Sequence, residues 1–222
     1  MKRLSKRLLH ICNLIKTNGC VIDVGSDHAL VAINLLKRHR CRKVYNIEVS
    51  SKPLHNTIKN LINECLINKT ENILCNGLQT NKILEKINTC IIAGMGGDKI
   101  VDILKHANKK IKIDEYIFVP NTHANKLRKY LKSKNFKCIK EKIVFENKRF
   151  YQLIQVSKNK GIKIKNNDDI LFGPYNLKHI SRNLINLTNE RRKFIISNSL
   201  DKYNRNIKTE LLQIERFIKK WN

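Results

Sequence analysis

The chain has 222 residues, 45 of them Lys or Arg and only 18 Asp or Glu, with a formal net charge of +27 and 41% hydrophobic residues. This apolar content can form a sizeable core, which argues against wholesale disorder, and no apolar run approaches the roughly 20 residues of a membrane span. The basic start lacks the continuous apolar stretch of a signal peptide. We therefore expect a cytoplasmic protein without a membrane partner. The shortage of acids favours a polyanionic partner, with a merely solubilising charge as the alternative.

The first half of the chain alternates strand-like and helix-like segments. Apolar residues at helical spacing predict an amphipathic helix over 4–15, stopped by Asn18-Gly19. Strand patterns then occupy 20–24, 43–47, 72–74, 89–92 and 116–119, and helix patterns begin at 28 and cover 52–66, 98–106 and 124–133. Strands separated by crossover helices indicate a parallel sheet with helices on both faces.

The second half departs from this rhythm. Segments 138–145 and 150–156 are strand-like, and the four residues between them are too few for a parallel crossover, so they predict an antiparallel hairpin. The polar stretch 157–169 is interpreted as a linker. Apolar stripes over 177–194 and 200–221 then predict two helices, packed either as a coiled pair or against the main domain. We expect a Rossmann-like domain over 1–160 and a linker with a helical domain over 161–222.

Candidate cofactor-binding residues lie at the predicted carboxyl ends of the first two strands. In a doubly wound sheet, ligands bind at this edge. Asp23 and Gly25 end the first strand and Ser26 opens the turn that follows, where glycine allows close approach and a helix N-terminus offers N–H groups to a carboxylate. Glu48 ends the second strand, about 20 residues later, as a ribose-binding acid does. A simple strand-to-helix connection is the alternative for the glycine turn.

The next strand ends supply further candidates. Asn76, Gly77 and Leu78 follow the third strand, where an amide oxygen and backbone N–H groups suit an adenine ring, although an ordinary Asn-Gly turn is an alternative. Ala93, Gly94, Met95 and Gly96 close the fourth strand, and their glycines permit backbone approach to a ligand. Asn121 follows the fifth strand, where an acceptor pocket and a helix N-cap are equal alternatives. A sheet ending in a hairpin favours a class I methyltransferase over a nicotinamide-binding Rossmann domain.

Seven cysteines without a Cys-x-x-Cys pair, and scattered histidines, predict neither a disulfide framework nor a metal site.

Several motifs together resemble a known family. They are Leu4-Ser5-Lys6-Arg7-Leu8, Asp23-Val24-Gly25-Ser26-Asp27-His28-Ala29, Asn76-Gly77-Leu78, Ala93-Gly94-Met95-Gly96-Gly97, Pro120-Asn121 and Gly173-Pro174. Their order and spacing resemble those of bacterial tRNA (adenine-22-N1)-methyltransferases over nearly the whole chain. The resemblance implies a class I methyltransferase domain with a C-terminal coiled-coil domain, S-adenosyl-L-methionine as cofactor and tRNA as substrate. The family usually has Asp where Asn76 stands, an aromatic residue where Leu30 stands, and Gln where Val119 stands.

This reaction suggests roles for further residues. Methylation of adenine N1 leaves a cationic ring, which a carboxylate stabilises, and Asp27 beside the predicted donor is the candidate, with helix capping as its alternative. His28 is a candidate for holding the substrate, and Arg7 for a bidentate contact with the cofactor carboxylate or RNA phosphate. Candidates for phosphate contacts are Arg40, Arg42, Lys126, Arg128 and Lys129. We expect a monomer. A non-catalytic RNA-binding protein and a nicotinamide-dependent enzyme are the alternative functions.

Overall fold

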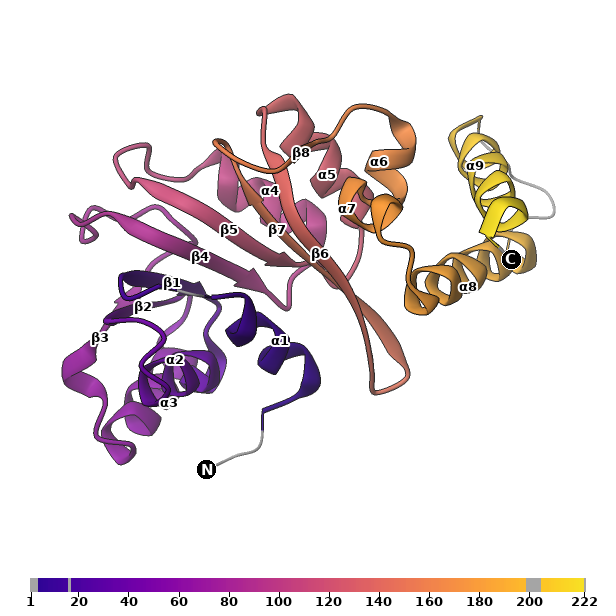
Figure 1. The fold of residues 1–222 in the computed structure, drawn as a ribbon. Coiled ribbons are helices and arrows are strands. Elements are labelled where there is room, and N and C mark those ends of the chain that lie inside the picture. Colours follow the sequence, from indigo (N-terminus) through magenta and orange to yellow (C-terminus); the bar gives the residue numbers. More distant parts are fainter. Residues whose placement is uncertain (1–3, 16, 199–204, 222) are drawn as a thin grey trace.

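A single mixed sheet forms the centre of the protein (Figure 1). The computed structural model describes residues 4–15, 17–198 and 205–221. Within these residues the sheet has the strand order β3-β2-β1-β4-β5-β7-β6-β8. The strands are β1 (Cys20–Val24), β2 (Lys43–Glu48), β3 (Thr70–Leu74), β4 (Ile87–Ala93), β5 (Ile113–Val119), β6 (Lys137–Glu146), β7 (Arg149–Ser157) and β8 (Ile162–Lys163). The first five strands pair in parallel with one another, whereas β7 pairs antiparallel with β5 and with β6, and β8 pairs antiparallel with β6. The predicted parallel sheet and closing hairpin are confirmed.

Helices cover both faces of the parallel strands (Figure 1). The helices α1 (Lys6–Leu14), α2 (Leu30–Lys37) and α3 (Ser51–Asn63) share one hydrophobic cluster with the sheet, and α4 (Gly97–Lys105) and α5 (Ala124–Ser133) share another. The central strands are apolar on both faces because both faces are buried, and β1 is buried along its whole length. Helix α3 ends at Asn63, three residues before its predicted end at Leu66, because Cys65 adopts a left-handed φ of 56°.

The segment predicted to be a linker is structured, so that prediction was wrong. Residues 162–163 form β8 on the edge of β6, and α6 (Asn167–Phe172) and α7 (Pro174–Lys178) follow. A capping box between Asn166 and Asp169 starts α6. Two of the polar residues of this stretch, Asn166 and Asp169, are therefore capping residues.

Two longer helices, α8 (Arg182–Asn198) and α9 (Arg205–Trp221), complete the described chain (Figure 1). The first starts at Arg182 and not at Leu177, which belongs to α7. The predicted break at Asn198-Ser199 falls partly in 199–204, outside the described residues. The predicted stripe residues Leu200 and Tyr203 lie wholly within that range. The two helices contact each other and share a third cluster with α6 and the outer face of the hairpin, where Ile143 packs beside Phe172 and Phe217.

A buried ion pair connects this outer part to the parallel sheet. Arg128 of α5 is 0% exposed, and its Nε donates to Glu141 Oε1 of β6 at 2.8 Å. Glu141 Oε2 accepts from the backbone N–H groups of Tyr175 (3.1 Å) and Asn176 (3.3 Å) at the start of α7. The prediction that Arg128 contacts RNA phosphate was wrong, because its side chain is enclosed in the protein.

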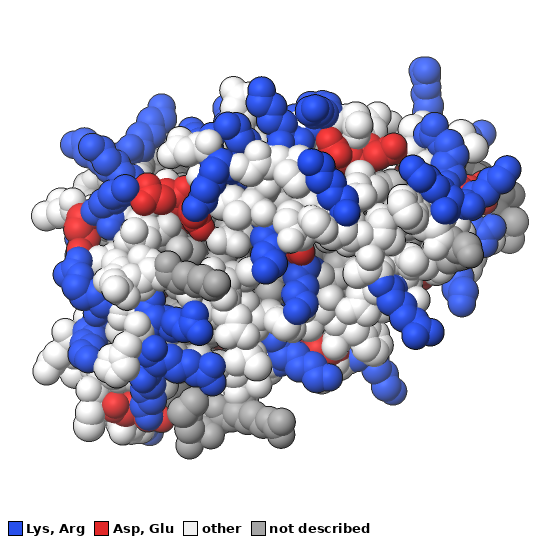
Figure 2. Space-filling view, in the orientation of Figure 1, with Lys and Arg blue, Asp and Glu red and all other residues white. Residues whose placement is uncertain are grey.

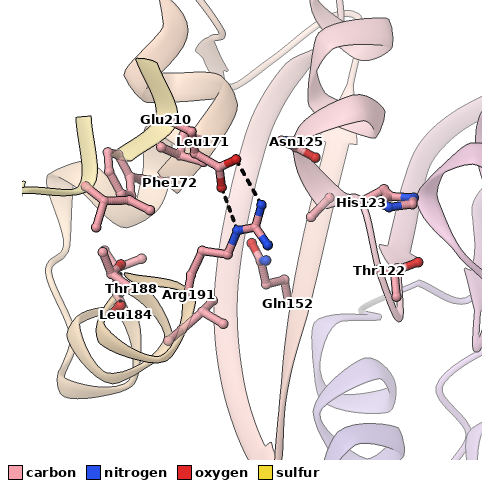
Figure 3. Close-up of a pocket in the computed structure, with 13 residues that line it drawn as sticks. Thr122, His123, Asn125, Gln152, Leu171, Phe172, Leu184, Thr188, Arg191 and Glu210 are labelled. Atoms are coloured by element: carbon pink, nitrogen blue, oxygen red, sulfur yellow. Dashed lines mark hydrogen bonds and ion pairs between the residues drawn. The ribbon is translucent and has the colours of Figure 1, made fainter. Parts of the chain in front are cut away.

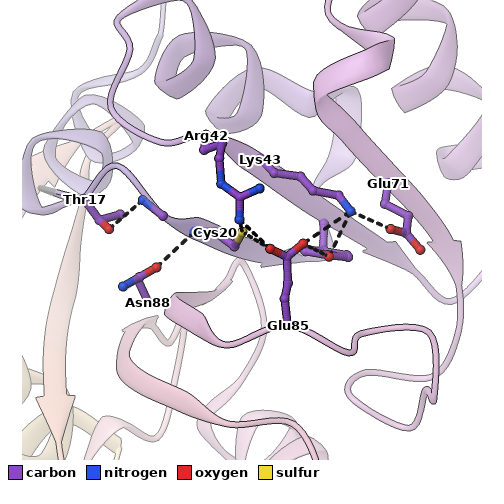
Figure 4. Close-up of polar contacts among 9 residues, drawn as sticks. Thr17, Cys20, Arg42, Lys43, Glu71, Glu85 and Asn88 are labelled. Atoms are coloured by element: carbon purple, nitrogen blue, oxygen red, sulfur yellow. Dashed lines mark hydrogen bonds and ion pairs between the residues drawn. The ribbon is translucent and has the colours of Figure 1, made fainter.

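A second polar cluster lies at the amino-terminal edge of the parallel strands (Figure 4). Glu85, in the helix-free connection between β3 and β4, accepts hydrogen bonds from Cys20 Sγ, Tyr45 Oη and Arg42 Nη2. These contacts, with the Cys20 bond first, lower the pKa of Glu85 to about 2. The cluster ties this connection to β1 and β2.

Candidate functional site

The loop after β1 brings a turn of unusual backbone geometry to the carboxyl edge of the sheet. Gly25 has φ of +74°, and a Cβ at this position would lie 2.7 Å from Met95 Cε of the loop after β4. His28 and Ala29 are also left-handed, with φ of 63° and 55°, although neither is glycine. Such strain persists only where the surroundings hold it and is concentrated at functional sites. Because of this turn, α2 starts at Leu30 and not at His28 as predicted.

Glu48 holds the same loop from the neighbouring strand. Its Oε1 accepts from Ser26 Oγ at 3.0 Å and from the Asp27 backbone N–H at 2.8 Å. Its Oε2 has no hydrogen bond to the described residues, although the side chain is only 6% exposed. One carboxylate oxygen therefore fixes the loop and the other is available to a ligand. Beside it, Val49 is 70% exposed and presents an apolar surface at the same edge, which no sequence motif indicated.

Asp23 is a buried acid without a hydrogen-bond partner among the described residues. It is 4% exposed at the end of β1. Burial, and to a lesser degree the charge of Glu48, raise its pKa to about 7. Two carboxyl groups thus share a poorly solvated edge, an arrangement that favours a ligand carrying positive charge.

The loop after β3 lies next along the same edge. Cys75 N–H donates to the Glu48 carbonyl at 2.8 Å, which places the exposed Asn76 beyond the ribose-binding candidate. Gly77 has φ of +59° and packs against Ile103 of α4. The side chain of Leu78 is buried in the core, so only its backbone faces this edge.

The loops after β4 and β5 close the site on its other side. Gly94 has φ of +78°, and a Cβ there would meet no atom within 4 Å, so its surface is open. Asn121 Nδ2 donates to the Gly94 carbonyl at 2.8 Å, and its backbone N–H donates to the Met95 carbonyl at 2.8 Å. Asn121 therefore fixes the glycine loop, while Gly96 caps α4. The two roles predicted for Asn121, an amide in an acceptor pocket and a helix N-cap, do not include this contact with the glycine loop.

Helix α1 brings Arg7 near this edge. Ser5 caps the helix by accepting from the Leu8 N–H at 3.3 Å. The Arg7 guanidinium carbon lies 4.5 Å from the ring centroid of Tyr151, and the buried Arg7 Nε has no hydrogen-bond partner. The Nε–H group of Arg7 is thus a hydrogen-bond donor without an acceptor among the described residues.

The other predicted phosphate contacts fall in different places. Lys126 and Lys129 are exposed on α5, which starts at the carboxyl edge of β5. Lys126 Nζ lies 3.0 Å from Asp98 Oδ1, and this contact, followed by that of His123, lowers the pKa of Asp98. Arg40 and Arg42 precede β2 and lie at the opposite edge of the sheet, where Arg42 pairs with Glu85. The structure therefore does not bring these two arginines to the site.

A cavity of about 400 Å³ adjoins the site and was not predicted (Figure 3). Thr122 and His123 line it on the β5 side, and Leu184 and Thr188 of α8 line it on the other. Across its opening, Arg191 Nε and Nη2 bind the two carboxylate oxygens of Glu210 at 2.7 and 3.0 Å. Its lining comes from segments far apart in the chain, so no local sequence signal indicates it.

The strand order, with parallel strands followed by an antiparallel hairpin, defines a Rossmann-like fold of the class I methyltransferase type. A family model described as "Methyltransferase domain" matches residues 4–154, and the chain belongs to this family.

Similar proteins are known from several bacteria. The chain is 28% identical over 153 residues to the tRNA (adenine(22)-N(1))-methyltransferase of Bacillus subtilis, covering 68% of this chain and 64% of that protein. The structure of M. capricolum TrmK in complex with S-adenosyl-homocysteine has a TM-score of 0.87 at 28% identity, covering 97% of this chain and 98% of that one. A protein of the NADB-Rossmann superfamily from Streptococcus agalactiae has a TM-score of 0.88 at 27% identity, covering 97% of both chains.

Among the described residues, no helix is both long and apolar enough to cross a membrane. The same residues contain no group of three or more His, Cys, Asp or Glu side chains arranged to hold a metal ion.

Proposed function

We propose that the protein methylates N1 of an adenine in tRNA, at position 22, with S-adenosyl-L-methionine as methyl donor. The observation that carries the proposal is the carboxyl edge itself, where the ends of β2, β1 and β4 bring a free oxygen of buried Glu48, the Gly25 turn and the open Gly94 loop side by side. The choice of adenine N1 and of tRNA rests on similarity to the Bacillus subtilis enzyme, and the choice of methyl donor on similarity to TrmK bound to S-adenosyl-homocysteine. We infer that the reaction takes place in the cytoplasm.

The residues at this edge fit the donor group by group. Glu48 Oε2 accepts from ribose hydroxyls, and the exposed amide of Asn76 with the backbone of Leu78 suits the adenine ring. Val49 offers an apolar wall beside them. The pKa of the buried Asp23 carboxyl is raised to about 7 in the protein alone, and a cationic group of the cofactor beside it favours its ionised form. When bound, the cofactor supplies an activated methyl group on a sulfonium.

The chain's own contribution to the reaction is placement and electrostatic stabilisation. Holding two reactants in line corresponds to roughly 7–11 kcal/mol of the barrier. N1 normally faces its pairing partner, so the adenine must be unpaired or turned out of its stack. Asp27 is the residue proposed to meet the ring: its side chain is 74% exposed, while its backbone is held by Glu48. Its carboxylate accepts from the adenine amino group and stabilises the positive charge that develops on the ring.

Positive charge supports tRNA as the substrate. Figure 2 shows Lys and Arg side chains spread over the whole visible face, with few acids between them. Lys129 is exposed on α5 near the site and has no ion-pair partner among the described residues. Such cations attract and position a polyanion but carry no sequence information.

The pKa of Asp23 leads to a pH prediction. A carboxyl group whose pKa is raised by folding adds stability below its unfolded pKa, near 4, and loses that contribution as pH rises through about 7. We expect Asp23→Asn to remove this loss, on the order of a few kcal/mol in the unfolding free energy. Urea unfolding of both proteins without cofactor, at several pH values from 4 to 8, measures the difference. A constant difference across this range would contradict the buried, protonated acid.

Nucleoside mass spectrometry of treated tRNA tests the proposed function. We expect 1-methyladenosine when an unmodified tRNA transcript is incubated with the protein and S-adenosyl-L-methionine, and none when position 22 of the transcript is guanine. An Asp27→Ala protein that still binds cofactor should methylate at least about 100-fold more slowly. If neither transcript is methylated and NAD binds more tightly than S-adenosyl-L-methionine, the nicotinamide alternative is favoured. If tRNA binds but neither cofactor does, the protein is a non-catalytic RNA-binding protein.

A further inference from the structure

The hairpin of β6 and β7 projects beyond the carboxyl edge of the sheet (Figure 1). Phe118 pairs with Ile154, and β5 ends one residue later at Val119, so residues 149–152 extend past the end of β5. Four residues of antiparallel strand span roughly 13 Å. The tip of the hairpin therefore reaches outward on the side of the molecule where the proposed reaction takes place.

Alternating side chains give this projecting hairpin two different faces. Tyr151 and Val144 face α1, where Arg7 stacks on Tyr151. The opposite face carries Phe145 and Phe150, which are cross-strand partners with ring centroids 4.7 Å apart. Phe145 is 46% exposed, so a large aromatic surface meets solvent at the tip.

A groove of about 570 Å³ lies between this aromatic pair and α8. Asn183, Asn186 and Asn189 line its helical wall. The Asn183 amide donates to the Ile143 carbonyl at 2.8 Å, which fixes the wall against the hairpin. The amides of Asn186 and Asn189 have no hydrogen bond to the described residues, so their donors and acceptors remain available. An aromatic surface facing free amides matches the two faces that a nucleobase presents, its ring and its polar edge.

Cations surround the groove. Lys148 and Arg149 are exposed at the hairpin turn, and Lys193 lies on the wall formed by α8. None of the three has an ion-pair partner among the described residues. Of the described residues that line the groove, only Glu190 carries a carboxylate, within a chain of net charge +27. The charge therefore favours a polyanionic occupant over a second copy of this strongly basic chain.

The same face of the hairpin connects the groove to the candidate site. Gln152, two residues from Phe150 and on the same side of β7, lines the 400 Å³ cavity that begins at Thr122 and His123. Helix α8 forms a wall of both hollows, with Leu184 and Thr188 in the cavity and Asn186 in the groove. The groove and the cavity therefore follow one another along the same face of the hairpin, toward the carboxyl edge.

We infer that this groove is a second nucleobase site, which stacks an unpaired base of the tRNA other than the adenine that is methylated. The inference rests on the proposed function for the identity of the RNA. Phe145 and Phe150 supply the stacking surface, the free amides contact the polar edge of the base, and Lys148, Arg149 and Lys193 contact the adjoining phosphates. Stacking of this kind tolerates any base, so the groove contributes to affinity and placement more than to sequence choice.

Steady-state methylation and filter binding with Phe145→Ala test this inference. We expect the Kd and KM for tRNA to rise about 10- to 30-fold, with the Kd for S-adenosyl-L-methionine and the circular dichroism spectrum unchanged. Phe145→Trp should restore tight binding, because the larger ring still stacks. The matched control is Leu84→Ala, since Leu84 is an exposed apolar residue (92%) in the connection before β4, and its Kd for tRNA should match that of the wild type.

The salt dependence of binding separates stacking from charge. Phe145→Ala should leave the slope of log Kd against log salt unchanged, whereas Lys148→Ala should reduce it by about 1. Ultraviolet cross-linking to tRNA should identify a nucleotide on the peptide that contains Phe145.

An unchanged Kd for tRNA in Phe145→Ala would overturn the inference. So would a wild-type dimer, detected by sedimentation, that Phe145→Ala converts to a monomer, because a second copy would then cover the groove. A wild-type protein that binds tRNA through Phe145 but methylates no transcript would reject the proposed function and leave the base-stacking groove supported.

Discussion

Glu48→Ala is expected to weaken the binding of S-adenosyl-L-methionine by at least about 100-fold, or ~2.7 kcal/mol. The substitution removes the free Oε2 proposed to accept from the ribose, and it also removes the oxygen that holds Ser26 and Asp27. A hydrogen bond to a charged group contributes about 1.5–3 kcal/mol, so two ribose contacts account for the effect. Isothermal titration calorimetry measures it.

Two further variants show whether the loss of affinity is specific to the Glu48 carboxylate. Glu48→Gln keeps an acceptor oxygen but loses the charge, so its affinity should lie between those of the wild type and Glu48→Ala. Glu64→Ala removes an acid that pairs with Lys37 at the end of α3, and its cofactor affinity should be unchanged. An unchanged Kd in Glu48→Ala would contradict the ribose role.

Glu141→Ala is expected to lower the free energy of unfolding by about 3–5 kcal/mol. The Arg128 guanidinium is 0% exposed, and removing its carboxylate partner leaves a buried charge uncompensated. The substitution also removes the acceptor of two N–H groups at the start of α7. Urea unfolding followed by circular dichroism measures the loss.

Matched variants separate the buried charge from other effects. Glu215→Ala removes an acid that faces Arg192 Nη2 at 3.5 Å on the surface, and it should cost less than about 1 kcal/mol. The double replacement Arg128→Met with Glu141→Leu should recover much of the loss, because no charge then remains buried. Equal losses of unfolding free energy in Glu141→Ala and Glu215→Ala would contradict this expectation, because the buried pair would then stabilise the protein no more than the surface pair.

Periodicity was sufficient to predict the five parallel strands and the closing hairpin, but not β8. Strands such as β1 and β4 are mostly apolar because both of their faces are covered. The short turn before Arg149 permits only an antiparallel return. The strand ends then located Asp23, Glu48 and the Gly94 loop at one edge, since parallel strands bring their carboxyl ends together.

What the sequence could not predict depends on long-range contacts. Arg128 has the sequence context of an exposed helical cation, and only its contact with Glu141 of β6 allows it to be buried. The wrongly predicted linker contains few apolar residues, yet its caps and the single pair of residues in β8 give it structure. The groove at Phe145 likewise forms only when α8 packs beside the hairpin.

The position of the bound cofactor tests the central claim most directly. A crystal structure of this protein with S-adenosyl-homocysteine should place the ribose hydroxyls within about 3 Å of Glu48 Oε2. It should also place the sulfur between the Gly25 turn and the Gly94 loop, facing Asp27. A ligand bound in the cavity beside α8, or with its ribose away from Glu48, would contradict the account.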